Sequence, residues 1–231
     1  MILLFGDPHG RFDHVHSVVA ACRPAALILL GDIEAKRPLE MELAPIADLT
    51  QIWFIHGNHD TDSDAFHDNL FCSSLRERNL HGRVVEIDGK RVAGLGGVFR
   101  GHVWMPPQPP SYRSPEEFVA MCGKGNRWRG GLPRKHRSTI FQRQVEALYS
   151  ERADILVTHE APSAHPHGFE IIDDLARRLR VSKVFHGHHH DRLDYRDSYH
   201  RLGFEVHGVG LRGVTDCDGR VVIAGEFDSK Y

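Results

Sequence analysis

Short runs of apolar residues alternate with helix-like patterns over the first quarter of the chain. The runs at residues 1–5, 25–30 and 51–55 are apolar at nearly every position, which is typical of strands that are covered on both faces. The segments between them, 12–21 and 39–49, carry apolar residues at three- and four-residue spacing, as amphipathic helices do. This alternation of strand and helix predicts an α/β core.

A second set of strand-like and helical segments follows residue 80. Residues 83–87 and 91–97 are strand-like and are joined at Asp88-Gly89, a dipeptide that favours a tight hairpin turn. Strand-like runs at 154–158 and 183–186 then alternate with helical patterns at 139–150 and 171–180. The last forty residues are β-rich. We expect the N-terminal half to form one sheet, the later strands to form the other, and the segment after Asp191 to complete that second sheet.

Residues 100–137 differ from the rest of the chain. From residue 100 to residue 143 there are nine basic and two acidic residues, so this stretch carries +7 in a chain of net charge −2. It also contains the run Met-Pro-Pro-Gln-Pro-Pro at 105–110, which cannot continue a helix or a central strand. We expect an irregular basic insertion, or flap, at about 100–137 on a single domain that spans residues 1–231.

Composition excludes several classes of protein. A hydrophobic share of 41% and a charged share of 26% are ordinary for a globular chain, which argues against disorder. No apolar run approaches the roughly 20 residues that cross a bilayer, and residues 1–5 resemble a first strand more than a signal peptide. The four cysteines are far apart, which favours reduced thiols in a cytoplasmic protein. The unusual number is histidine, at 18 residues.

Polar clusters follow five of the apolar runs directly. They are Asp7 and His9; Asp32; Asn58, His59 and Asp60; His159; and His188 and His190. Because ligands bind at the carboxyl ends of strands in α/β sheets, we expect these clusters to converge. Imidazole nitrogens with carboxylate and amide oxygens suit Mn, Fe, Zn, Co or Ni better than Mg. Glycines at 31, 57 and 187 permit the close backbone approach of such a site.

The order, types and spacings of these residues resemble the calcineurin-like metallophosphoesterase family. The matching motifs are Asp7-x-His9, Gly31-Asp32, Gly57-Asn58-His59-Asp60, His159 and Gly187-His188-x-His190. The resemblance implies a four-layer α/β/β/α sandwich of two packed mixed sheets flanked by helices. The segment Thr158-His-Glu-Ala-Pro162 looks like the phosphodiesterase-type members, and the longer Gly-Asp-x-Val-Asp-Arg-Gly signature of the serine/threonine protein phosphatases is absent.

The resemblance also implies a reaction and its cofactors. Two divalent metal ions, with manganese or an iron and zinc pair favoured, would hold a bridging hydroxide that attacks a phosphate ester. One ion would take Asp7, His9, Asp32 and His190, and the other would take Asp32, Asn58, His159 and His188. Asp32 would bridge them. In the family, the histidine at the position of His59 stabilises the phosphoryl group or protonates the leaving group.

One position departs from the family pattern. Many relatives carry an acid three residues after the bridging aspartate, where it orients the catalytic histidine, and this chain has Ala35 there. Glu34 and Asp60 are the two candidates to replace it. Without a replacement, His59 would be poorly oriented and turnover would be reduced.

The sequence leaves the substrate open. A phosphorylated small molecule or a nucleotide is the expected partner, with a phosphodiester slightly favoured over a monoester, and no membrane is expected. The basic stretch 100–143 keeps a nuclease or nucleotide-processing enzyme as an alternative, because its charge and aromatic rings would suit a nucleic acid. Arg127 and Arg129 are the weak candidates for phosphate contacts. A solvated flap with its own small aromatic core, or a surface that docks another chain, explains the stretch somewhat better. A non-catalytic scaffold is a third interpretation, which only Ala35 supports.

Overall fold

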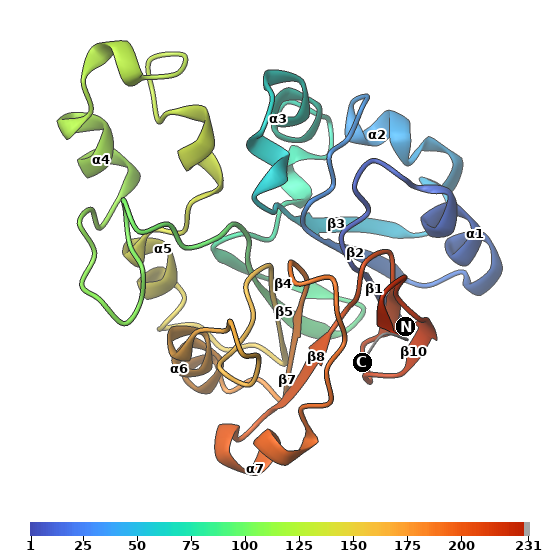
Figure 1. Cartoon of the computed structure of the whole chain (residues 1–231). Coiled ribbons are helices and arrows are strands. Elements are labelled where there is room, and N and C mark those ends of the chain that lie inside the picture. The colour runs from blue at the N-terminus through green and yellow to red at the C-terminus, as the bar shows by residue number, and fades with distance from the viewer. Residues whose placement is uncertain (229–231) are drawn as a thin grey trace.

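The apolar runs form the strands of two five-stranded sheets that pack face to face. The strands are β1 Ile2–Phe5, β2 Ala26–Leu30, β3 Gln51–Ile55, β4 Arg83–Ile87, β5 Lys90–Leu95, β6 Ile155–Thr158, β7 Lys183–His186, β8 Glu205–Gly208, β9 Val214–Asp216 and β10 Val221–Ile223. The computed structural model describes residues 1–228 (Figure 1). The first sheet has the order β10-β9-β1-β2-β3, and the second has the order β4-β5-β6-β7-β8.

Parallel pairing decides where the polar turns lie. In the first sheet β1, β2 and β3 run parallel, with Phe5 opposite Leu29 and Leu30 opposite Ile55. In the second sheet β5 to β8 run parallel, and β4 joins them antiparallel through the predicted hairpin turn at Asp88. The turns after β1, β2 and β3 therefore share one edge of the first sheet, and those after β6 and β7 share one edge of the second.

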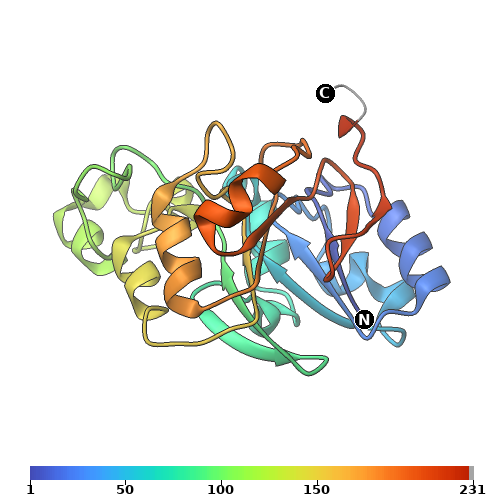
Figure 2. The same ribbon diagram turned by 90° about the horizontal axis from the view of Figure 1, so that it is seen from below.

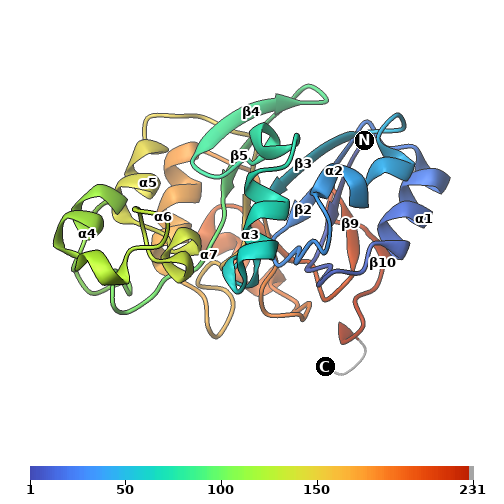
Figure 3. The same ribbon diagram turned by 90° about the horizontal axis from the view of Figure 1, so that it is seen from above.

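Helices cover the outer face of each sheet. They are α1 Asp13–Cys22, α2 Leu39–Glu42, α3 Asp64–Phe71, α4 Pro115–Met121, α5 Gln142–Ala147, α6 Glu170–Leu179 and α7 Tyr199–Leu202. α1 packs on the first sheet through Val15 and Val19, and α6 packs on the second through Ile172 and Leu175. Figures 2 and 3 show α1 and α6 on opposite sides of the paired sheets. This is the predicted four-layer α/β/β/α arrangement.

Alternate side chains of one buried strand enter two different cores, because successive residues of a strand point to opposite faces. In β1, Ile2 and Leu4 join the core between the sheets, together with residues of β2, β3, β5, β6 and β7. Leu3 and Phe5 join the core under α1. Burial on both faces explains why β1 and β2 are apolar at every position.

Two expectations about the elements were wrong in detail, and one helix was missed. The helix expected at 39–49 is short, because Pro45 interrupts the pattern and only a 3₁₀ turn follows α2. α3 was not predicted, although Ser63 caps it by accepting a hydrogen bond from the Phe66 N–H. The segment after Asp191 does not complete one sheet. β8 extends the second sheet, whereas β9 and β10 pair along the free edge of β1 in the first.

The basic insertion, residues 100–137, projects at one end of the molecule as a set of loops around α4 (Figure 1). It is more ordered than expected, since Ser114 caps α4 by accepting from the Glu117 N–H and Pro115 occupies its first turn. This Ser-Pro start is a helix signal in the sequence. Trp104 and Phe118 are buried in the same apolar core as residues of α5 and α6, so the insertion has no separate core of its own among these side chains.

Two smaller observations bear on the class of protein. All four cysteines carry free thiols. Within residues 1–228, no helix combines the length and the apolar character needed to cross a membrane.

Candidate metal centre

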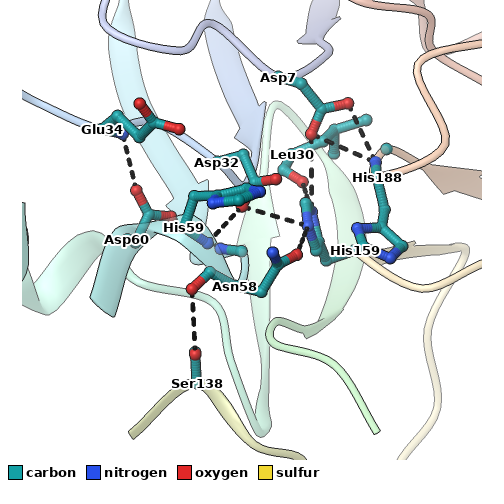
Figure 4. A network of polar contacts seen from close by, with 12 residues as sticks. Asp7, Leu30, Asp32, Glu34, Asn58, His59, Asp60, Ser138, His159 and His188 are labelled. Carbon is teal, nitrogen blue, oxygen red and sulfur yellow. Dashed lines mark hydrogen bonds and ion pairs between the residues drawn. The ribbon is translucent and has the colours of Figure 1, made fainter. Parts of the chain in front are cut away.

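The polar turns of both sheets meet at the seam between them. The first sheet contributes Asp7 and His9 after β1, Asp32 after β2, and Asn58 and His59 after β3. The second contributes His159 after β6, and His188 and His190 after β7. Figure 4 shows Asp7, Asp32, Asn58, His159 and His188 gathered in one place. We call the seven expected metal ligands together the metal centre.

The backbone turns sharply where it presents these side chains. Asp7, His9, Asp32, His188 and His190 all have positive φ, between 35° and 71°. Residues other than glycine adopt such angles only when the surrounding structure compensates for the strain, and they cluster at functional sites. The sharp turns direct side chains from the ends of separate strands toward one place.

Glycines leave the room that the metal centre occupies. A Cβ atom on Gly57 would lie 2.2 Å from the Oδ1 atom of Asp32, and one on Gly31 would lie 2.4 Å from the Nδ1 atom of His159. At Gly187 the nearest atom to a Cβ would be the Oδ1 atom of Asp7, at 3.0 Å. The expectation of close backbone approach at these three glycines is confirmed.

The side chains form two groups of donor atoms that share one carboxylate. Donor atoms of His9, Asp32 and His190 all lie within 4.8 Å of one another, as do those of Asp32, His159 and His188. The Oδ1 atom of Asn58 lies 3.2 Å from Nε2 of His159, so it adjoins the second group.

Asp7 lies beside the groups without joining either of them. Its Oδ2 atom accepts a hydrogen bond of 3.0 Å from the His188 N–H, and its Oδ1 atom lies 3.7 Å from Nδ1 of His159. The structure thus places Asp7 at the centre, whereas direct metal ligation by Asp7 stays a prediction.

Hydrogen bonds prepare two of the histidines for a metal ion. Nδ1 of His159 donates to the Leu30 carbonyl oxygen at 2.8 Å, and Nδ1 of His9 lies 2.6 Å from Oε1 of Glu34. An imidazole held through one nitrogen offers the lone pair of the other, which is the usual arrangement of histidine ligands. The other ring nitrogen of His9, Nε2, shares a hydrogen bond of 2.9 Å with Nε2 of His190. The donor set therefore fits divalent ions.

Burial makes positive charge favourable at this site. Asp7, Asp32 and His159 are almost completely buried. Burial raises the pKa of the Asp7 carboxyl to about 8, and the charge of Asp32 adds to that rise. Burial alone would lower the pKa of His159, but the charge and hydrogen bond of Asp32 and the charge of Asp7 raise it to about 10. A proton on His159 supplies positive charge here, and metal binding would supply it instead.

The other two histidines stay neutral and free to bind a metal. Burial, followed by the charge of His159, lowers the pKa of His188 to about 3. Burial and the neighbouring His9 lower the pKa of His190 as well. Neutral imidazole is the form that binds metal.

His59 is oriented by an aspartate that the sequence analysis did not select. Its Nδ1 lies 2.6 Å from Oδ2 of Asp62, and its backbone N–H donates to Asp32. Partial burial alone would lower the pKa of His59, but the hydrogen bond to Asp62 and the charge of Asp32 raise it. Asp62 follows His59 by three residues within a 3₁₀ turn, a spacing that would have identified it.

The two expected substitutes for the acid at Ala35 serve other partners. Glu34 pairs with His9. The buried Asp60 accepts hydrogen bonds from the N–H groups of Gly57 and Glu34, and burial raises its pKa to about 7. Asp60 therefore fixes the two loops that carry Asp32 and Asn58. We had expected Asp60 to act as a catalytic acid that orients His59, but its hydrogen bonds go to these backbone N–H groups instead.

The two arginines proposed to contact phosphate are occupied elsewhere. The Arg127 guanidinium donates to the carbonyl oxygens of Val119 and Cys122 within the insertion. Arg129 forms a two-pronged ion pair with Asp68 of α3. These contacts hold the two guanidinium groups against the insertion and α3, and none of them supports the expected role at the substrate.

Known proteins resemble this chain in sequence and in fold. Residues 1–192 match the family model described as calcineurin-like phosphoesterase. The chain is 43% identical over 223 residues to an uncharacterized protein of Haemophilus influenzae (strain ATCC 51907 / DSM 11121 / KW20 / Rd), a match that covers 96% of each. The crystal structure of TT1561 of Thermus thermophilus has a similar fold, with a TM-score of 0.59 at 14% identity over 97% of both chains. The matched range 1–192 contains all seven residues of the metal centre.

Proposed function

The chain belongs to the calcineurin-like phosphoesterase family, and we propose that it hydrolyses a phosphate ester with two divalent metal ions. Members of this family are generally metal-dependent phosphoester hydrolases. The observation that carries the proposal is the pair of donor groups that share Asp32. A scaffold without catalysis would not require two groups of donor atoms at one carboxylate.

We assign the ligands as the sequence predicts. One ion would be held by Asp7, His9, Asp32 and His190, and the other by Asp32, Asn58, His159 and His188. Bound there, two divalent ions neutralise the charge of a phosphate ester and activate water for attack, with manganese or an iron and zinc pair favoured. Glu34 and the Leu30 carbonyl hold the rings of His9 and His159 in place.

His59 is the residue that we assign to the phosphoryl group or the leaving group. Its side chain is half exposed beside the metal centre, with a ring centroid 5.6 Å from that of His9. Asp62 fixes the ring through Nδ1, so Nε2 remains for the substrate. We therefore transfer the orienting role from Glu34 or Asp60 to Asp62, and the loss of an acid at Ala35 need not reduce turnover.

A nucleotide is the second candidate substrate. The insertion contains a pocket of about 490 Å³, lined in part by the rings of His102, Tyr112, Phe118 and His136 and by Lys135. Aromatic rings with a nearby cation suit a base and its phosphate. Two residues beyond His136, Ser138 adjoins the metal centre, since its Oγ lies 3.4 Å from the Asn58 carbonyl oxygen. A phosphodiester remains slightly favoured over a monoester.

Hydrolysis of two model esters tests the proposal. The purified protein is loaded with Mn²⁺ and assayed against bis-p-nitrophenyl phosphate and p-nitrophenyl phosphate. We expect metal-dependent hydrolysis that Asp32→Ala abolishes together with metal binding, whereas Asp48→Ala, a change at an exposed aspartate away from the site, has no effect. Equal rates for the wild type and Asp32→Ala on both esters would overturn the proposal.

A further inference from the structure

Arg100 occupies a position that the proposed function does not explain. It follows β5, and the residues around it connect to both halves of the metal centre. The Phe99 N–H donates to Oε1 of Glu160 at 2.9 Å, and the Oε2 atom of Glu160 lies 3.9 Å from Nε2 of His188. On the other side, Ser138 links Arg100 to the Asn58 loop. Arg100 therefore lies beside the donor group of Asp32, His159 and His188.

The Arg100 side chain is held in place but only partly used. Nη1 donates to the Ser138 carbonyl oxygen and to Oγ1 of Thr139, both at 2.9 Å, and Nη2 donates to Oγ of Ser138 at 3.3 Å. A guanidinium group has five N–H donors. Two of them, the Nε–H and one Nη2–H, have no partner within residues 1–228. Side by side, these two donors grip an anion with two parallel hydrogen bonds.

The charge of Arg100 is also unpaired, which sets it apart from other arginines of the insertion. Within the part of the chain that the structure describes, no carboxylate forms an ion pair with it, whereas Arg113, Arg129 and Arg134 each have one. Arg100 is half-buried. Burial lowers the pKa of its guanidinium, and the more distant charges of Asp62, Glu160 and Asp32 partly offset this effect.

A half-buried cation beside two divalent ions is costly unless an anion lies between them. With metal ions bound, Asp32 would be shared with them and would offset less of the Arg100 charge. The anion that can enter between Arg100 and the metal ions is the phosphate group of the substrate. Held by three hydrogen bonds and with two donors free, Arg100 has the geometry of a preformed anion clamp.

We propose that Arg100 binds phosphoryl oxygens of the substrate beside the metal centre and so acts as a substrate-binding residue. This inference rests on the proposed function for the identity of the anion. It assigns to Arg100 the role that the sequence had suggested for Arg127 and Arg129.

Titration with inorganic phosphate tests the inference without turnover. The Mn²⁺-loaded wild type, Arg100→Met and Arg100→Lys are compared by calorimetry, with Arg129→Met as the matched control. Loss of a two-pronged charged contact predicts phosphate binding about tenfold to a hundredfold weaker in Arg100→Met. Arg100→Lys keeps the charge without the paired donors and is expected between the two. Metal content and thermal unfolding are measured for every variant, because Arg100 also anchors Ser138.

The outcomes separate this inference from the proposed function. Phosphate affinity in Arg100→Met within twofold of the wild type, at equal metal content, would overturn the role of Arg100. If Arg100→Met does not fold, then an affinity of Arg100→Lys for phosphate equal to that of the wild type would also overturn the role of Arg100. Suppose that phosphate binding depends on Arg100 but the protein hydrolyses neither model ester. The anion site would then be supported, and the proposed hydrolase activity would be refuted.

Discussion

The metal centre and the basic insertion hold their charges in opposite ways. In the metal centre Asp7, Asp32 and His159 are buried, crowded and stabilised mainly by one another. In the insertion Arg113, Arg129 and Arg134 pair with separate acids near the surface. The first arrangement favours an added cation, whereas these three arginines of the second already have acidic partners.

The difference shows that a run of charge in the sequence need not be a charged surface in the fold. The insertion has a formal excess of positive charge, but Arg129 and Arg134 bind Asp68 and Asp64 of α3. α3 lies well before the insertion in sequence and supplies acids that the insertion lacks. Arg100, which lies beside the metal centre, is an arginine that this pairing leaves for a ligand.

The largest effect is expected from filling the space at Gly57. In Gly57→Ala the new methyl group would meet Oδ1 of Asp32 at 2.2 Å, so the shared carboxylate must move. We expect activity to fall about a hundredfold or more and metal content to fall with it. Gly125→Ala in the insertion meets nothing within 4 Å and should match the wild type. Full metal content and activity in Gly57→Ala would show that the Asp32 carboxylate can move away from the new methyl group without loss of the site.

Removing the acid that orients His59 should have the next largest effect. Asp62→Asn leaves every expected metal ligand in place but weakens the contact that fixes the imidazole. We expect kcat to fall about tenfold to a hundredfold with metal content unchanged, as for other residues that orient a working group. Asp48→Asn is the control. If Asp62→Asn retains wild-type kcat while Glu34→Gln loses it, then the assignment of Asp62 is wrong.

Acid should destabilise the protein through histidines that are neutral in the native state. Burial lowers the pKa of His81, and burial and then the charge of Arg100 lower that of His136, to about 4 in each case. The unfolded chain takes up these protons near pH 6.5 and the native state only near pH 4, so stability falls as pH decreases across that window.

The expected loss is on the order of 2 kcal/mol for His81. It is smaller for His136, because less of that side chain is buried and solvent screens more of its charge. Denaturant unfolding at pH 7 and at pH 4.5 measures both losses, and His81→Gln and His136→Gln should each show a smaller difference between the two pH values. An unchanged difference in either variant would contradict the assignment for that histidine.

The smallest effect is expected at the exposed ion pairs of the insertion. Arg129→Ala and Asp68→Ala each break a solvent-exposed pair, and such pairs contribute little to stability. We expect wild-type turnover, metal content and phosphate binding in both variants, and no salt-sensitive binding of DNA or RNA to the protein. Nucleic-acid binding that weakens with salt and disappears in Arg129→Ala would instead favour the nuclease alternative.

The inner strands and the polar clusters at the strand ends could be predicted from the pattern of the amino-acid sequence, and the four-layer fold from the resemblance of its motifs to a known family. Burial on both faces leaves a continuous apolar run, and a ligand cluster after such a run is visible without coordinates. The partner of His59, in contrast, was misjudged. Glu34 and Asp60 are close to the right position in sequence, but the sharp turns direct them to His9 and to backbone N–H groups.

The folded arrangement alone decides which charged side chains lack a partner of opposite charge. Asp64 and Asp68 come from a helix that the sequence did not reveal, and they neutralise Arg134 and Arg129 across more than sixty residues. Among residues 1–228, Arg100 has no carboxylate partner for the same reason, since its neighbours in space are Ser138 and Thr139. Charge pairing depends on distances of a few ångströms between segments that are remote in sequence. These distances cannot be inferred from the composition of the chain.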